Sequence, residues 1–501
     1  MTPIHTLIQQ VEIFDGTGAP SFHADVALAG TQIVALAEAG SLSLAQADAL
    51  PSQAYQINAS TRCIDGRGLA LAPGFIDVHT HDDREALDHP SMRPKLTQGV
   101  TTVITGNCGI SLAPWQADRA PPAPLSLIGT QSDYRYAQFA DYLSALQQAQ
   151  PALNVAAMVG HSTLRVACME DLSRAANSAE LAAMQDLLEQ AMQAGAFGFS
   201  SGLFYPTAKA SPNSEVIALA QIAGRHAAVY TSHIRDEYDG VIAALAEACD
   251  AGQQAQVPVV LSHHKCAGPK NWGRSSETLD YIRQRQRSQA VALDAYPYTA
   301  GSTVLDPDYV DDVIRIMITF SEPHPEMQGR DLAEIAKAWQ VDQKTAAQRL
   351  LPAGAVYFQM DEADVQRILS YPYTMIGSDG LPHDAHPHPR LWGAFPRVLG
   401  HYAREQKLFS FAAAIHKMTG LSAAQFGLSR RGRIATGLQA DLVLFDPQTI
   451  SDQASFAEPK RAAKGIHAVW VNGGLALGQS QLSAQRYGQV LRRQTERFGV
   501  M

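Results

Sequence analysis

Eight apolar runs of strand length recur along the middle of this chain, and segments with helical periodicity lie between them, such as 136–150, 178–195 and 240–252. Runs that are apolar throughout are typical of strands buried on both faces, and their alternation with helices predicts a parallel sheet. Eight such strands predict an α/β fold, a (β/α)8 TIM barrel. The runs are residues 75–81, 101–109, 154–162, 195–203, 228–234, 257–265, 291–298 and 374–380.

The two ends of the chain have a different pattern. Residues 1–71 and 432–501 contain short β-type runs broken by Gly and Asp, which predicts one small β-sandwich domain built from both termini. Residues 72–431 would then form the barrel. Within it, residues 299–373 separate the seventh and eighth runs and are too long for an ordinary connection. We expect an inserted subdomain there, and two interpretations stay open: a lid over the barrel mouth, or an insertion without a role in catalysis.

Charge and cysteine content exclude several classes of protein. The net charge of −9 gives no basic surface for nucleic acid or anionic lipid. The 5 cysteines are scattered, without the spacing of a disulfide framework or a CxxC metal site, which favours a reducing compartment. The N-terminus lacks the features of a signal peptide, and no apolar run is long enough to span a bilayer. We therefore expect a soluble, cytoplasmic protein with no membrane or nucleic-acid partner; nothing in the sequence indicates its oligomeric state.

Metal-ligating side chains stand where the predicted strands end, which is where barrel enzymes have their active sites. Imidazole, thiolate and carboxylate are the ligands that zinc prefers. Each of these residues alone is better explained as a turn or a packed side chain, but their joint placement at strand ends is hard to attribute to chance. The residues are His79 and His81 on the first strand, Cys108 on the second, His233 on the fifth, His263 and His264 on the sixth, and Asp379 on the eighth.

Spacing refines this set. His79 and His81 are two residues apart in an extended strand, so their side chains point the same way. The fifth and sixth runs both end in Ser-His, which favours His263 over His264 as the inward residue. The histidine-rich stretch 381–389 is better explained as a Pro-rich loop whose histidines contact substrate or solvent, so we leave it outside the metal site.

Several motifs resemble known families. "GFIDVHTHDD", "GSDG" and the tail "GRIATGLQADLVLFD" resemble the amidohydrolase superfamily, over nearly the whole chain. Within it, "TGNCGIS", "GLFYPTAKAS", "TSHIRDE" and "LSHHK" resemble the N-acyl-D-amino-acid deacylases, or D-aminoacylases. Many members of the superfamily carry a metal-bridging lysine on the fourth strand, whereas the fourth run here ends "FSSGLFY".

The resemblance implies a metal site and a reaction. It places one tightly held Zn²⁺ on Cys108, His233 and His263, and lets His79, His81 and Asp379 border a second, weaker position; the number of metals stays open. The implied reaction is hydrolysis of an N-acyl-D-amino acid to a carboxylate and a free D-amino acid by metal-activated water. Asp379 would be the general base and then the general acid. The residues expected to bind this small-molecule substrate are Tyr205, Lys265, Tyr296, Ser302 and Arg390.

Two alternatives remain at this stage. One is a cyclic-amide hydrolase of the dihydroorotase or hydantoinase type, which the cysteine motif and the missing fourth-strand lysine disfavour. The other is a non-catalytic, hydantoinase-like scaffold, which would be expected to lack the metal ligands. Both apolar and acidic D-amino acids, such as D-glutamate, are open as substrates. Gly106 and Gly109, on either side of Cys108, are expected to make room for a tight backbone turn near the metal.

Overall fold

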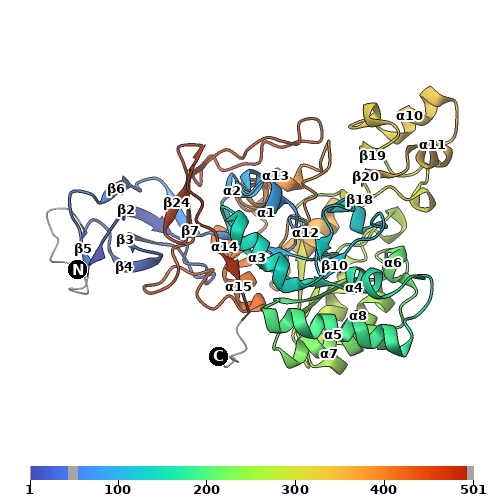
Figure 1. Ribbon diagram of the computed structural model, residues 1–501. Coiled ribbons are helices and arrows are strands. Elements are labelled where there is room, and N and C mark those ends of the chain that lie inside the picture. Colours follow the sequence, from blue (N-terminus) through green and yellow to red (C-terminus); the bar gives the residue numbers. More distant parts are fainter. Residues whose placement is uncertain (1, 43–54, 494–501) are drawn as a thin grey trace.

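The computed structural model describes residues 2–42 and 55–493, which form a mixed α/β structure (Figure 1). Each of the eight expected runs contains strand, and neighbouring strands pair in parallel. The third run is interrupted at Met158, so it contributes two short strands. The strands in order are β8 (Phe75–Asp77), β9 (Val100–Thr105), β12 (Asn154–Ala157) and β13 (Val159–Gly160), β14 (Gly198–Gly202), β15 (Val229–His233), β16 (Val259–Leu261), β17 (Val291–Ala295) and β21 (Thr374–Ile376).

Hydrogen bonding joins these strands in chain order. β8, β9 and β12 belong to one parallel sheet, and β13 to β17 followed by β21 belong to another. An isolated parallel bridge between Thr80 and Gly380 links the segments that follow the first and last strands. Buried side chains from these strands, or from the residue just before a strand, pack into a single apolar cluster. The cluster includes Ile76, Ile104, Ala156, Met158, Phe197, Val229, Val260, Ala292 and Met375.

Helices lie between successive strands and pack their apolar faces on the sheet. α5 (Ser178–Ala194) shows why they form where they do: the Asn177 side chain caps its first turn together with Glu180, and Gly195 ends it in the left-handed conformation. The other helices are α1 (Glu85–Asp88), α2 (Arg93–Leu96), α3 (Phe139–Ala149), α4 (His161–Cys168), α6 (Pro206–Lys209), α7 (Asn213–Arg225), α8 (Val241–Ala255), α9 (Ser275–Arg285), α12 (Glu362–Ser370), α13 (Arg390–Arg397), a π-helix (Val398–Glu405), α14 (Phe411–Met418) and α15 (Gly420–Phe426).

Strands from both ends of the chain form one nine-stranded sheet, which lies at one end of the molecule (Figure 1). Strand β7, the last strand of the N-terminal part, pairs with β22 from the C-terminal part. The core of the sheet likewise joins the two parts, since Leu71 and Trp470 belong to one apolar cluster. The strands are β2 (Thr6–Ile13), β3 (Phe22–Ala29), β4 (Gln32–Glu38), β6 (Arg62–Asp65), β7 (Ala70–Pro73), β22 (Leu442–Phe445), β23 (Ile466–Val471), β24 (Gly474–Gly478) and β25 (Gln481–Leu482).

Three short pairings lie outside these sheets. β1 (Thr2–Pro3) pairs with β5 (Tyr55–Gln56), and β10 (Trp115–Gln116) pairs with β11 (Arg135–Tyr136). Near the C-terminus, β26 (Val490–Leu491) pairs in parallel with β12. The last described residues therefore return to the parallel strands and do not stay with the terminal sheet.

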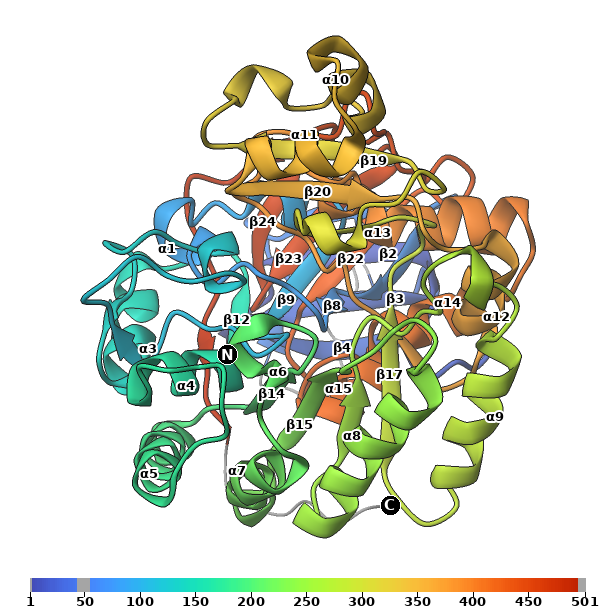
Figure 2. The same ribbon diagram turned by 90° about the vertical axis from the view of Figure 1, so that its right-hand side faces the viewer.

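The segment between β17 and β21 has its own small sheet and core. β18 (Gly301–Val304), β20 (Ala353–Tyr357) and β19 (Ile316–Ser321) are antiparallel, and α10 (Leu332–Trp339) and α11 (Gln343–Leu350) pack on them. Figure 2 shows these elements together above the parallel strands. Helix α12 is different, because it packs against α9 and β21 and belongs structurally with the other helices of the parallel sheet. In the parts of the chain that the structure describes, no helix combines the length and apolar character needed to cross a membrane.

Candidate metal centre

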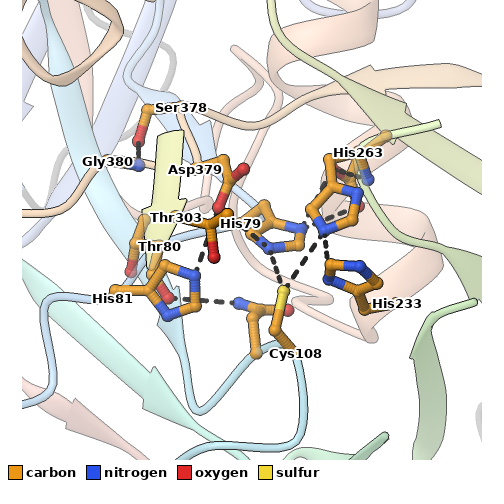
Figure 3. Close-up of polar contacts among 12 residues, drawn as sticks. His79, Thr80, His81, Cys108, His233, His263, Thr303, Ser378, Asp379 and Gly380 are labelled. Carbon is orange, nitrogen blue, oxygen red and sulfur yellow. Dashed lines mark hydrogen bonds and ion pairs between the residues drawn. The ribbon is translucent and has the colours of Figure 1, made fainter. Parts of the chain in front are cut away.

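The first strand supplies two buried imidazoles. His79 Nδ1 lies 3.1 Å from Asp294 Oδ1, and this contact leaves Nε2 directed at Cys108 Sγ, 3.1 Å away (Figure 3). His81 Nε2 lies 3.2 Å from Asp379 Oδ1. A carboxylate on one imidazole nitrogen that fixes the other nitrogen toward a common point is the usual arrangement around a metal-binding histidine.

The Cys108 thiol is presented by a strained turn after β9. Cys108 has a φ of 53°, and Gly106 and Gly109 on either side both have a φ of 76°. A side chain on Gly106 would collide with the carbonyl of Met158, so glycine is required there for steric as well as conformational reasons. The turn is held by Ser200 of β14, whose Oγ accepts a hydrogen bond from Gly109 N at 3.0 Å and donates one to Gly106 O at 2.6 Å. The strand that lacks the bridging lysine thus supports the cysteine instead.

The fifth and sixth strands bring two more imidazoles to the same thiol. His263 Nε2 lies 2.9 Å from His233 Nδ1 and 3.4 Å from Cys108 Sγ. His263 Nδ1 is 3.1 Å from Glu237 Oε1, which again pairs a ligand imidazole with a carboxylate. His263, like Cys108, has a left-handed backbone, with a φ of 35°. The preference for His263 over His264 agrees with the structure, since His264 Nε2 turns away to Thr278 Oγ1 at 2.8 Å.

Two groups of donor atoms therefore share Cys108. One contains His79, His81, Cys108 and Asp379, and the other contains Cys108, His233 and His263; within each group one donor atom per residue lies within 4.8 Å of the others. All of these residues are buried, and imidazole with thiolate is a donor set suited to zinc. The donor sets contain all six residues that the sequence singles out as metal ligands.

The electrostatic character of the site also suits a cation. Burial opposes ionisation of the Cys108 thiol, but the charges of His79 and His263 lower its pKa well below the ordinary cysteine value. Burial alone would lower the pKa of His81, yet its hydrogen bonds to Asp379 and Cys108 raise that pKa to about 9. The centre thus holds buried anionic donors and attracts positive charge, as a zinc site must.

Asp379 follows β21 and faces both the donor cluster and a cavity. Its backbone φ is 49°, and its amide donates to the carbonyl of His79 at 2.7 Å. Burial would raise the pKa of its carboxyl, but Arg390, whose Nη1 lies 2.9 Å from Asp379 Oδ2, and His79 hold that pKa well below the ordinary value. Asp379 is therefore ionised at neutral pH.

Four of the five expected substrate-binding residues border one cavity beside the metal ligands. The cavity has an empty volume of about 420 Å³, and its wall includes His81, His233, His263 and Asp379. Lys265, the third residue of "HHK", points its Nζ to Glu237 Oε1 at 2.6 Å. The substrate-binding candidates on this wall are Tyr205, Lys265, Tyr296 and Ser302.

Arg390 is placed differently from the other four. It is fully buried behind Asp379, it is not on the cavity wall, and its Nη2 donates to the carbonyl of Ser302 at 3.0 Å. Its guanidinium carbon lies 4.5 Å from the centre of the Tyr296 ring. The charged group that Arg390 contacts is thus the carboxylate of Asp379.

The histidines of residues 381–389 all contact the folded chain, although His383 and His386 are also partly exposed to solvent and only His388 is buried. His386 Nε2 lies 2.7 Å from the carbonyl of Phe456, and His388 Nε2 lies 3.0 Å from that of Ala300. His383 Nδ1 is 2.8 Å from Arg84 Nη2. These contacts with two backbone carbonyls and an arginine hold the loop that follows Asp379 in place.

Sequence reasoning missed two carboxylates that orient the ligands. Asp294 lies one residue before the end of β17, and its Oδ1 also accepts a hydrogen bond from the amide of His263 at 2.8 Å. Glu237 lies four residues after His233 in "TSHIRDE". The position of Asp294 near a strand end was the signal that could have identified it.

Comparisons with known proteins agree with this site. A model of the Amidohydrolase family matches residues 62–303 and 325–476. The chain is 50% identical over 486 residues to N-acyl-D-aspartate deacylase of Alcaligenes xylosoxydans xylosoxydans, which is 97% of this chain and 94% of that protein. It is also 50% identical over 491 residues to D-aminoacylase of the same organism, 98% of each chain.

A solved structure matches equally well. The crystal structure of N-acyl-D-glutamate deacylase from Bordetella bronchiseptica, complexed with zinc and a phosphonate inhibitor that mimics the tetrahedral intermediate of the reaction, superimposes with a TM-score of 0.91. The sequences are 45% identical, and the match covers 98% of this chain and 100% of that one. The resemblance seen in the motifs is confirmed: the chain belongs to the amidohydrolase family and, within it, to the N-acyl-D-amino-acid deacylases.

Proposed function

We propose that this chain is a zinc-dependent deacylase that hydrolyses the amide bond of N-acyl-D-amino acids to a carboxylate and a free D-amino acid. The observation that carries the proposal is the pair of donor groups sharing Cys108, placed where the parallel strands end and opening with Asp379 onto one cavity. The relatives support it, since all three are named as deacylases of D-amino acids or as a D-aminoacylase.

The two groups of donor atoms would bind metal with different affinity. We assign the tightly bound zinc to Cys108, His233 and His263, and a second, weaker position to His79, His81 and Asp379 with Cys108 shared. Zinc bound there would lower the pKa of a water molecule and polarise the substrate carbonyl. Glu237 and Asp294 would hold the imidazoles of His263 and His79 in the orientation that binding requires.

Asp379 is our candidate for proton transfer. As an ionised carboxylate at the cavity wall, it can accept a proton from the attacking water and return it to the departing amine nitrogen. Arg390, paired to its other oxygen, keeps the carboxylate charged and fixes its direction.

The substrate carboxylate needs cationic and hydroxyl donors. Ser302 Oγ and Arg390 Nε are buried and have no hydrogen-bond partner within the described residues, so both keep donor capacity. We propose that Ser302, Lys265 and Tyr296 bind the α-carboxylate from the cavity wall, and that Tyr205 completes the wall near His233. Arg390, behind the wall, would turn its free Nε toward the same carboxylate when substrate enters.

We further propose the domain arrangement that goes with this site. Residues 72–431 would close into a (β/α)8 barrel, supported by the Thr80–Gly380 bridge and by the apolar cluster that the strands share. Residues 1–71 and 432–501 would form a small β-sandwich, apart from β26, which pairs with β12. Residues 299–373 would form an insertion that acts as a lid, apart from α12, which packs with the helices of the parallel sheet. A cytoplasmic location stays a prediction, in keeping with five free cysteines among the described residues.

The test is direct. The purified protein is assayed for zinc and for hydrolysis of N-acetyl-D- and N-acetyl-L-amino acids, with a hydantoin as the control for cyclic-amide hydrolysis. We expect bound zinc and turnover of D-substrates. Turnover of the hydantoin instead would support the cyclic-amide alternative, and absence of zinc or a preference for L-substrates would refute the proposal.

A further inference from the structure

We propose that this site selects N-acyl-D-amino acids with an uncharged, apolar side chain over those of D-aspartate and D-glutamate. The inference rests on the proposed function and narrows it. The relatives do not decide the matter, because their names cover D-aspartate, D-glutamate and D-amino acids in general. The lining of the cavity does.

Charge balance leaves no cation for a second carboxylate. Among the described residues that border the cavity, Lys265 is the only lysine or arginine, and its ammonium group is already paired with Glu237 at 2.6 Å. Arg390, behind the wall, is paired with Asp379 at 2.9 Å. The free donors on Ser302, at the wall, and on Arg390, behind it, are the ones proposed for the α-carboxylate that every N-acyl-amino acid carries. A side-chain carboxylate would lose its water without gaining an unpaired cation.

Apart from Lys265, Glu237 and the metal-site residues, the wall consists of apolar, aromatic and uncharged polar residues, the last including Thr303 and Gln359. Leu127, from the 3-10 helix Leu125–Leu127, and Leu381, just after β21, both border the cavity. The hydroxyls of Tyr205 and Tyr357 are engaged, with Thr303 Oγ1 at 3.1 Å and the carbonyl of Val304 at 3.2 Å respectively. Their rings therefore offer faces rather than free donors, which suits an aliphatic or thioether side chain.

The insertion adds negative charge to a segment that reaches the cavity wall through Phe204 and His233. Tyr309 packs on Phe204 and Tyr238, with ring centres 5.0 and 5.4 Å apart, and Phe204 stacks on His233. The same short segment carries four aspartates, of which Asp308 is paired with Lys344. A substrate with two negative charges would be repelled by these aspartates more than one with a single charge. The four are Asp306, Asp308, Asp311 and Asp312.

The zinc-loaded enzyme tests this with a substrate panel. kcat/KM is measured for N-acetyl-D-leucine, N-acetyl-D-methionine, N-acetyl-D-glutamine and N-acetyl-D-glutamate; the last two have the same shape and differ in charge. We expect leucine and methionine to be best, and glutamate to fall below leucine by about 100-fold and below glutamine as well. A value for glutamate equal to or above that for leucine would overturn the inference while leaving the proposed function standing. Failure to hydrolyse any D-substrate would overturn both.

A matched pair of variants separates charge from shape. Thr303 borders the cavity and is only partly buried, so Thr303→Arg can place a cation there, and Thr303→Gln is the uncharged control. We expect the ratio of the glutamate to the leucine kcat/KM to be at least about tenfold higher in Thr303→Arg than in Thr303→Gln. Equal ratios in the two variants would contradict the charge argument.

Discussion

Lys95 Nζ lies 2.8 Å from Asp77 Oδ2 in a place that solvent does not reach. The same ammonium group donates to Ser378 Oγ at 2.7 Å, and Asp77 Oδ1 accepts the amide of Ser378, also at 2.7 Å. Asp77 belongs to β8 and Ser378 follows β21, between which the described backbone shows only the isolated Thr80–Gly380 bridge. Through these hydrogen bonds to Ser378, the ion pair joins the segment that carries His79 and His81 to the one that carries Asp379.

Replacing Lys95 by Met should destabilise the protein by about 3–5 kcal/mol, because it leaves the Asp77 carboxylate buried without a cation. Urea unfolding measures the change. Lys344→Met is the control, since Lys344 forms an exposed pair with Asp308 and its loss should barely move the midpoint. A Lys95→Met protein as stable as this control would show that the buried pair does not hold the two segments together.

Cys108→Ala should lose zinc and activity together, since both donor groups contain this thiol. Cys63→Ala serves as the control because Cys63 is exposed and lies on β6 of the terminal sheet. Metal content of the dialysed proteins and turnover of an N-acetyl-D-amino acid are the two measurements. Full zinc content in Cys108→Ala would exclude the thiolate as a ligand.

Asp379→Ala should keep the tightly bound zinc, whose proposed ligands do not include Asp379, and should lose about 10²–10⁴-fold in kcat. Zinc stoichiometry and steady-state kinetics on one preparation separate the two effects. A near-native rate would remove Asp379 from proton transfer.

Arg390→Met should lower kcat as well as raise KM. A residue that only bound the substrate carboxylate would change KM, but Arg390 also pairs with Asp379 and holds its charge. The measurement is steady-state kinetics that determine kcat and KM separately for Arg390→Met and the unchanged protein. A rise in KM with an unchanged kcat would mean that the contact with Asp379 does not matter for turnover.

Glu215→Gln should destabilise the protein at neutral pH and progressively less in acid. Glu215 Oε1 lies 2.9 Å from His161 Nε2 and 2.5 Å from Arg165 Nη1. Burial raises the pKa of Glu215, but these two partners lower it to about 2, from an ordinary value of 4.5. The carboxylate thus stabilises the fold fully above about pH 5, and this contribution disappears as the pH falls toward 2.

The measurement is urea unfolding of both proteins between about pH 7 and about pH 2.5, the range that covers the pKa values of the unfolded and folded states. We expect a difference of about 3–5 kcal/mol at pH 7, which narrows as the pH falls. A difference in the free energy of unfolding that stays constant over this range would show that the stabilisation by Glu215 does not depend on its ionisation.

Much of the fold and the ligand set could be predicted, because both leave local signals. Strands buried on both faces are apolar throughout, and ligands such as Cys108 and His233 stand at their ends. Lys95 and Glu237 could not be predicted as partners of the site, because their roles depend on which strands become neighbours in space. The same limit explains Arg390: the sequence places it after the eighth strand, but only the packing of α13 shows that Asp379 lies in front of it.

The left-handed backbone at Cys108, His263 and Asp379 serves the function of the site but lowers the stability of the fold. Each of these residues adopts a backbone conformation that costs a residue other than glycine on the order of 1–3 kcal/mol. Glycine would relieve that cost at all three positions and abolish the chemistry. Directed evolution for heat resistance alone, without a screen for turnover, would therefore erode this centre first, and thermostable variants of such a chain need to be selected for activity at every round.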